Sequence, residues 1–127
     1  MAILIDEKSR ILVQGVTGKT GSFHTGRMKS YGTNIVAGTS PGKGGQEVEG
    51  VPVFDTVAEA VEATGCDTSV LFLPARFVLD SAVEACRAGI KLVVVVPEHI
   101  PVHDILKLRE ISERHGTRIV GGNTPGL

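Results

Sequence analysis

Short runs rich in valine, isoleucine and leucine alternate with helical patterns along most of this chain, and this alternation limits the fold more than any other feature. The runs occupy residues 11–16, 34–40, 51–55, 68–74, 90–97 and 117–122. They are almost continuously apolar, which is typical of parallel strands that are covered on both faces. The alternation therefore predicts βαβ units joined by right-handed crossovers.

The segments between the strands have helical signals. Helices are predicted over residues 22–31, 56–64, 77–88 and 102–115. Thr56 and Glu59 have the spacing of a capping box, and Gly89 and Gly116 follow the last two helices as C-terminal caps. We predict an α/β fold: a Rossmann-like, doubly wound, mainly parallel sheet with helices on both faces, formed by one domain over residues 1–127.

Composition excludes several classes of function. The net charge is −1, aromatic residues make up 4% of the chain and tryptophan is absent, so neither an overall positive field nor a stacking platform favours nucleic acid. No apolar run approaches the roughly 20 residues of a membrane span. The first ten residues, MAILIDEKSR, lack the pattern of a secretory signal. We predict a cytoplasmic protein, with an organelle matrix as the alternative.

Side chains that bind metals or catalyse reactions form no recognisable constellation. Cys66 and Cys86 do not form a CxxC pair, and both lie in or beside helical patterns, so buried reduced thiols are predicted for them. No two histidines are spaced as a metal pair on one helix. No serine has a recognisable histidine and aspartate partner. We therefore predict neither a metal site nor a catalytic residue within this chain.

The segment GVTGKTG, residues 15–21, joins the first strand to the first helix and is the strongest candidate for a ligand site. It contains GKT but is not an ATP-binding P-loop, because that motif needs glycine where this chain has Val13. Its glycines follow the pattern GxxGxxG, close to a dinucleotide fingerprint. A glycine turn before a helix lets backbone N–H groups approach a phosphate. The alternative is a turn that only permits tight packing.

The end of the second strand discriminates among nucleotides. A binding site for NAD has a carboxylate there, whereas this chain has Ser40, Pro41 and then Lys43 on a glycine-rich loop. A lysine attracts a phosphorylated ribose, which NADP has at its 2′ position and coenzyme A at its 3′ position. The alternative is that Lys43 is a solvated surface charge.

Three segments together resemble one protein family. The stretches ILIDEKSRILVQGVTGKTGSFH, YGTNIVAGTSPGKGGQEVEGVPVFDTVAEAVEATG and AGIKLVVVVPEHIP are similar to the N-terminal CoA-binding domain of the succinate–CoA ligase α subunit family, which includes malate–CoA ligase-like relatives. The resemblance extends from Ile3 to Leu127. It implies coenzyme A as the ligand. The CoA-binding positions that it implies are Thr17, Gly18, Lys19, Thr20, Lys43, Val96, Pro97 and Glu98.

Three further positions, one serine and two prolines, complete the predicted site. Ser40 and Pro41 precede Lys43, and Pro74 follows the fourth strand, where it either faces the ligand or only terminates the strand. The family usually has PNCPG where this chain has GNTPG at residues 122–126, so no role resting on that cysteine transfers.

The resemblance also implies a place in a larger enzyme. The family's reaction passes through a phosphohistidine on a second α-subunit domain, and this chain is expected to end before that domain. None of the histidines here, at positions 24, 99, 103 and 115, matches it. The implied partners are a β subunit and the C-terminal α domain of an ADP- or GDP-forming acyl-CoA ligase. The alternatives are a stand-alone CoA-binding or regulatory module without catalysis, and an NADP-binding domain.

Overall fold

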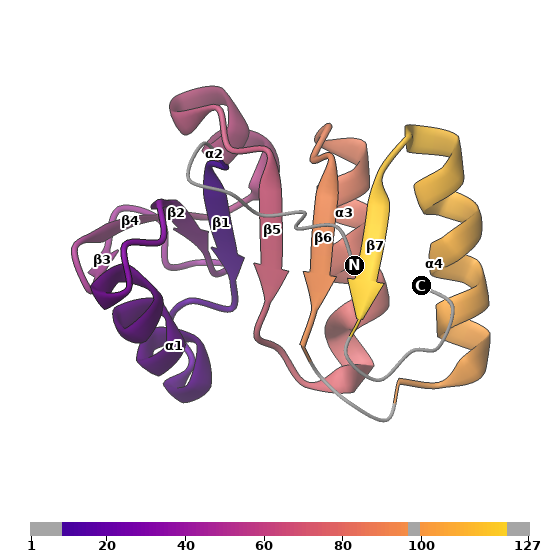
Figure 1. Ribbon diagram of the computed structural model, residues 1–127, viewed down its shortest axis with the longest axis horizontal. Coiled ribbons are helices and arrows are strands. Elements are labelled where there is room, and N and C mark those ends of the chain that lie inside the picture. The colour runs from indigo at the N-terminus through magenta and orange to yellow at the C-terminus, as the bar shows by residue number, and fades with distance from the viewer. Residues whose placement is uncertain (1–8, 97–99, 122–127) are drawn as a thin grey trace.

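The computed structural model describes residues 9–96 and 100–121, and these form one sheet with helices on both faces. The strand order is β3-β4-β2-β1-β5-β6-β7, and every pairing is parallel except that of β3 with β4. Figure 1 shows this order across the sheet. The strands are β1 Ile11–Gln14, β2 Ile35–Thr39, β3 Glu47–Val48, β4 Val51–Phe54, β5 Thr68–Leu71, β6 Leu92–Val95 and β7 Arg118–Gly121.

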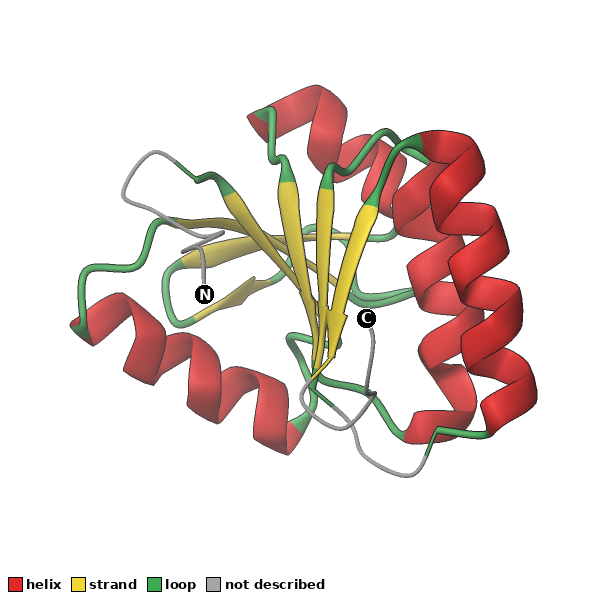
Figure 2. Ribbon diagram, turned by 45° about the vertical axis from the view of Figure 1, so that its right-hand side comes forward, coloured by secondary structure: helices red, strands yellow, loops and turns green. Residues whose placement is uncertain are grey.

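The helices divide unequally between the two faces of the sheet. In Figure 2, α1 lies on one face and the other α-helices lie on the opposite face. Two apolar clusters reflect this division: Met28 of α1 packs on the cluster around Val13, while Val57, Val78 and Leu108 of the other helices belong to the cluster around Leu12. The helices are α1 Lys19–Ser30, α2 Val57–Thr64, α3 Val78–Arg87 and α4 Val102–His115, with a 3₁₀ turn, η1, at Ala75–Phe77. The predicted fold class is confirmed.

The first helix begins earlier than the sequence predicts. Its first residue is Lys19 rather than Ser22, and Gly18 is the N-cap in an extended conformation (φ −70°, ψ 160°). No side chain caps this end of the helix. The sequence lacked the Ser, Thr, Asp or Asn signal that normally marks a helix start. As a result, Lys19 and Thr20 belong to the first turn of α1, where backbone N–H groups have no partner within the helix.

The short hairpin of β3 and β4 was not predicted as a pair of strands. Its turn uses Glu49 and Gly50, which have positive φ angles of 51° and 78°. This is the backbone conformation of a two-residue hairpin turn. The strand β3 has only two residues, so it is too short to show alternation in the sequence.

The order of the strands reverses between β1 and β5. The chain moves from β1 outward to β2, whereas it moves from β5 outward to β6 and β7 in the opposite direction. In such sheets the loops that follow the two central strands separate and leave a crevice at their carboxyl ends. The predicted GVTGKTG turn follows β1, so it lies at this crevice.

Both cysteines are buried and free, as predicted. Burial raises the pKa of the Cys66 thiol and of the Cys86 thiol above the usual value. Among the described helices, none is long and apolar enough to cross a membrane.

Candidate functional site at the carboxyl end of the sheet

Two of the three glycines in the first turn are required by packing. Gly15 has φ +85°, and a Cβ atom there would lie 2.4 Å from the carbonyl oxygen of Phe72. A Cβ atom at Gly21 would lie 2.1 Å from the carbonyl oxygen of Gly15. Neither distance is compatible with a side chain. These two glycines let the turn pack tightly between β5 and α1, so they say nothing about a ligand.

The middle glycine has no such packing requirement. A Cβ atom at Gly18 would have as its nearest neighbour the carbonyl oxygen of Gly15, at 3.4 Å, and the φ angle of Gly18 is an ordinary −70°. Gly18, Lys19 and Thr20 are all exposed. The first turn of α1 contains no acidic residue. Its N–H groups and the positive end of the helix dipole therefore face an open position that suits an anion.

A cleft of about 420 Å³ begins at this turn. Its lining residues are Gly18, Lys19, Thr20, Phe72, Leu73, Pro74 and Val96. One wall is thus the cationic first turn of α1, and the other is an apolar rim formed by the segments after β5 and β6. The cleft lies at the reversal of strand order, where ligands of this fold class bind.

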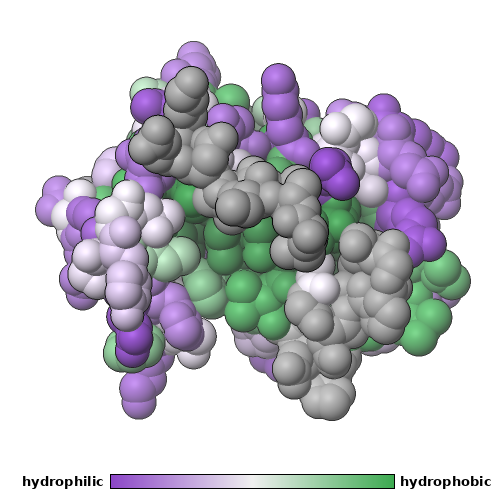
Figure 3. All heavy atoms as spheres, in the orientation of Figure 1, coloured by the Kyte–Doolittle hydropathy of each residue, from purple (hydrophilic) through white to green (hydrophobic). Residues whose placement is uncertain are grey.

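Sequence reasoning did not predict Phe72 and Leu73 as lining residues. The apolar run at 68–74 predicted a strand through Pro74, but β5 ends at Leu71, so all three following residues belong to the rim. The Phe72 ring stacks on His24 of α1, with 5.0 Å between the ring centroids and 5° between the planes. Figure 3 shows apolar residues gathered over the central strands beside α1. Phe72 also packs against the buried cluster that includes Val13 and Val70.

The glycine-rich loop after β2 holds Lys43 between two tight turns. The N–H of Lys43 donates to the carbonyl oxygen of Ser40 at 3.0 Å. Pro41 and Gly42 are the central residues of this turn, and Gly42 has φ +77°. Proline followed by a glycine with positive φ is the signature of a type II turn.

The second turn begins at Lys43 itself. The N–H of Gln46 donates to the carbonyl oxygen of Lys43 at 3.2 Å, and Gly45 has φ +91°. The N–H of Gly45 donates to the carbonyl oxygen of Val53 in β4 at 3.0 Å. The loop is thus tied to the neighbouring strand. The Lys43 side chain is exposed and forms no ion pair within residues 9–96 and 100–121.

A hydroxyl pair joins the first turn to this loop. Thr17 Oγ1 donates to Ser40 Oγ at 2.7 Å. This contact links segments that are 23 positions apart in the sequence. The structure therefore brings together the two predicted parts of the site, the glycine turn and the lysine loop. Pro41 is exposed on the loop, and Pro74 and Val96 lie in the cleft on the other side of the turn.

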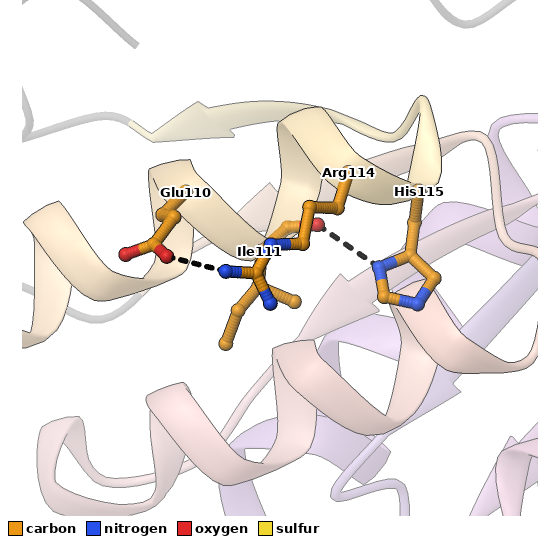
Figure 4. Close-up of polar contacts among 4 residues, drawn as sticks. All are labelled: Glu110, Ile111, Arg114 and His115. Atoms are coloured by element: carbon orange, nitrogen blue, oxygen red, sulfur yellow. Dashed lines mark hydrogen bonds and ion pairs between the residues drawn. The ribbon is translucent and has the colours of Figure 1, made fainter.

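Two of the predicted CoA positions, Pro97 and Glu98, lie outside the described residues, as does His99. His103 and His115 are exposed on α4. Figure 4 shows the end of this helix, where His115 Nδ1 lies 3.0 Å from the carbonyl oxygen of Ile111 and Arg114 pairs with Glu110 at 2.7 Å. These are local contacts of a solvated helix. No group of three potential metal ligands occurs among the residues that the structure describes.

Comparison with known proteins assigns this arrangement to a family. A family model described as "CoA binding domain" matches residues 6–99. The chain is 52% identical over its full length to a protein of Archaeoglobus fulgidus named succinate–CoA ligase [ADP-forming] subunit alpha 2, of which it covers 44%. It is 50% identical to the corresponding α subunit of Staphylococcus aureus, of which it covers 42%. The chain thus spans less than half the length of these relatives.

A solved structure shares the fold at lower sequence identity. The acetyl-coenzyme A synthetase 1 of Candidatus Korarchaeum cryptofilum, described as dinucleotide forming, superposes with a TM-score of 0.74 and 20% identity. The match covers 91% of this chain and 26% of that one. This likeness supports the fold alone.

Proposed function

Since the chain belongs to the CoA-binding domain family, we propose that it binds coenzyme A by the 3′-phospho-ADP end of that molecule. The observation that carries this proposal is Gly18. Glycine there is required neither by packing nor by its φ angle, yet a side chain would project into the opening at the first turn of α1. A ligand that approaches the backbone closely explains the glycine. Phosphate is the ligand group that suits a helix N-terminus.

The pyrophosphate of coenzyme A fits the first turn of α1. The N–H groups of this turn donate to the phosphate oxygens, and the Lys19 ammonium and the Thr20 hydroxyl lie beside them on the exposed side of the helix. The absence of acidic residues from this turn favours the same group. Anions are stabilised there by the helix dipole.

The 3′-phosphate fits the lysine loop. Lys43 lacks an ion-pair partner among the described residues, and Ser40 and Pro41 precede it in the same turn. The Thr17–Ser40 hydrogen bond holds this loop against the pyrophosphate turn. Two phosphate subsites next to each other match a ligand with phosphates on both the 5′ and 3′ positions of one ribose.

The cleft on the other side of the turn fits the pantetheine arm. Its apolar rim includes Leu73, Pro74 and Val96, and the last of these is 42% exposed. Pro97 and Glu98, which follow Val96 in the sequence, belong to the same proposed subsite. An arm that runs along this rim would leave the strand ends and present its thiol to a neighbouring domain.

The enzyme that this domain serves is an ADP- or GDP-forming acyl-CoA ligase of the succinate–CoA ligase type, working with a β subunit and a C-terminal α domain. The names of the two α-subunit relatives support this. The role of the chain is to bind and orient coenzyme A, which converts a bimolecular attack into a positioned one. No side chain here is assigned a bond-making role. A cytoplasmic location belongs to the same proposal, since two free cysteines suit a reducing compartment.

Isothermal titration of this chain with coenzyme A, dephospho-CoA, NADP and NAD tests the proposal. We expect coenzyme A to bind more tightly than each of the others. If NADP binds more tightly than coenzyme A, the chain is instead an NADP-binding domain. Tight CoA binding without any ligase activity, in the full-length protein combined with its β subunit, would favour the stand-alone module.

The variant Gly18→Val separates a ligand site from a structural turn. Its side chain enters the opening without meeting packed atoms, so the loss of stability should be limited to about 1 kcal/mol, because valine is a poorer N-cap than glycine. The affinity of the folded variant for coenzyme A should fall at least about tenfold, which is about 1.4 kcal/mol. Unchanged affinity in a folded variant would contradict a phosphate site at this turn. Ala58→Val, at an exposed position near the start of α2, serves as the control for adding valine methyl groups away from the predicted site.

A further inference from the structure

We infer that Asp55, the residue immediately after β4, is a positioning residue. It holds the lysine loop in the conformation in which Lys43 binds the ribose phosphate. This inference rests on the proposed function, because it concerns how Lys43 reaches the ligand. Asp55 was not among the residues predicted from the sequence. It is exposed and lies 11 positions after Gly44 in the sequence, and the fold places it against the lysine loop.

The contact between Asp55 and the loop is direct. Asp55 Oδ1 accepts a hydrogen bond from the N–H of Gly44 at 2.9 Å. A Cβ atom built on Gly44 would lie 2.9 Å from three atoms of the Asp55 carboxyl group. Gly44 does not have a positive φ angle. The glycine at this position is therefore explained by the closeness of the carboxylate rather than by backbone conformation.

Together with the Thr17–Ser40 hydrogen bond and the backbone hydrogen bond from Gly45 to Val53, this contact fixes the loop on either side of Lys43. The Thr17–Ser40 hydrogen bond fixes the beginning, and the Asp55–Gly44 hydrogen bond fixes the residue after Lys43. Between them Lys43 belongs to both tight turns. Backbone groups on either side of Lys43 are thus bonded to β4 or to the first turn, so the direction in which the lysine side chain leaves the loop is set before a ligand arrives. Such preorganisation raises affinity because less ordering is left to binding.

The negative charge of Asp55 and its positioning role predict opposite effects on the affinity for coenzyme A. A carboxylate beside a phosphate site repels the ligand, so its removal should raise the affinity for coenzyme A if electrostatics alone matter. Positioning predicts that its removal lowers the affinity. The variants Asp55→Ala and Asp55→Asn separate the two effects, because asparagine loses the charge but keeps an oxygen that accepts the Gly44 N–H.

The measurement is the ratio of the dissociation constants of dephospho-CoA and coenzyme A, obtained by titration of the whole chain. We expect Asp55→Ala to lower this ratio at least about threefold. Gly44→Ala, which displaces the carboxylate from the other side, should lower it equally, and Asp55→Asn should retain it. Asp80→Ala, an exposed aspartate on α3, is the matched control and should leave the ratio unchanged.

A double variant tests whether Asp55 acts through Lys43. In a Lys43→Ala background, Asp55→Ala should not change the ratio further, and a further fall in the ratio there would overturn the positioning role, because Asp55 would then act independently of Lys43. A general loss of structure is recognised in Asp55→Ala alone, because it would weaken both ligands equally and leave the ratio intact. A ratio that is unchanged or raised in Asp55→Ala overturns the positioning role, even though CoA binding stands. Failure of the unaltered chain to bind coenzyme A at all would instead overturn the proposed function.

Discussion

The two glycine-rich segments of this protein are glycine-rich for different physical reasons. In the turn after β1, Gly15 and Gly21 lie against backbone oxygens at distances that leave no room for a Cβ atom. In the loop after β2, Gly42 and Gly45 have nothing within 4 Å of the Cβ position, but both have positive φ angles. The first segment needs glycine for space, and at Gly15 for a positive φ angle as well, whereas Gly42 and Gly45 in the second need it for conformation alone.

This difference shows what each segment contributes to the site. The first turn is a rigid part of the core, packed between β5 and α1, and it presents helix N–H groups to the solvent. The second segment is an exposed loop, held by hydrogen bonds to β4, to the Asp55 carboxylate and to the first turn. Gly18 and Gly44 belong to neither class, since one faces an opening and the other faces the Asp55 carboxylate. Substitutions in the first turn should therefore affect mainly the stability of the fold, whereas substitutions in the loop should affect mainly the affinity for the ligand.

The largest effect is expected at Gly21. The Cβ atom of Gly21→Ala would overlap the carbonyl oxygen of Gly15, a backbone atom that cannot move without disturbing the turn. We expect a loss of about 3 kcal/mol in the free energy of unfolding, measured by urea denaturation. A loss below about 1 kcal/mol would mean that the turn is looser than its contacts indicate.

Removal of the Lys43 side chain comes next. Lys43→Ala should weaken coenzyme A by about 1.5–3 kcal/mol, the contribution of a charge-assisted hydrogen bond, and should leave dephospho-CoA almost unaffected. Stability should not change, because the side chain is exposed and has no ion pair within the described structure. Titration calorimetry of both ligands measures the effect. Lys91→Ala, an exposed lysine directly before β6, is the control. Equal losses for the two ligands would exclude Lys43 as a reader of the extra phosphate.

A smaller effect is expected at Gly45. An alanine there meets no neighbouring atom but must adopt φ +91°, which costs about 1 kcal/mol. Gly45→Asn should recover part of this, since asparagine tolerates positive φ better than alanine does. Gly32→Ala, with φ +86° and open space at the end of α1, should cost the same stability but leave ligand preference unchanged. A stability loss at Gly45 as large as that at Gly21 would remove the distinction between the two segments.

The smallest effect, of opposite sign, is expected at Gly26. This residue lies inside α1, without a positive φ angle, and a Cβ atom there would meet only the flexible Glu49 side chain at 3.3 Å. Alanine is the better helix former, so Gly26→Ala should raise the free energy of unfolding by about 0.5 kcal/mol. Thermal denaturation measures the shift. A destabilised Gly26→Ala variant would indicate that α1 needs this glycine for packing against the β3–β4 hairpin.

Much of the fold followed from local patterns. Continuous aliphatic runs predicted the central strands because residues buried on both faces of a parallel sheet are all apolar. The Thr56 cap and the glycines after α3 and α4 marked helix ends for reasons that operate within a few residues. Where such local signals were absent, prediction was wrong: α1 starts without a capping side chain, and the two residues of β3 are too few to show a period.

The site was predicted as two separate segments, and only the fold joined them. Charge and hydroxyl content pointed to Lys43 and Ser40, and the strand–turn–helix pattern pointed to Gly18. The hydrogen bond from Thr17 to Ser40, the hydrogen bond from Gly44 to Asp55 and the apolar rim at Phe72 had no signal that sequence reasoning used. The position of Asp55 at the end of a strand was the one available indication that this residue lies near the site.

The sequence by itself determined most of the strands and helices, and that a glycine turn follows the first strand, because periodicity, capping and turn chemistry depend on residues close together in the chain. The tertiary structure decided the order of the strands and therefore which strand ends are neighbours. It also decided which glycines are needed for space and which for conformation, because a Cβ atom is excluded by residues that approach from distant parts of the chain, as Phe72 approaches Gly15.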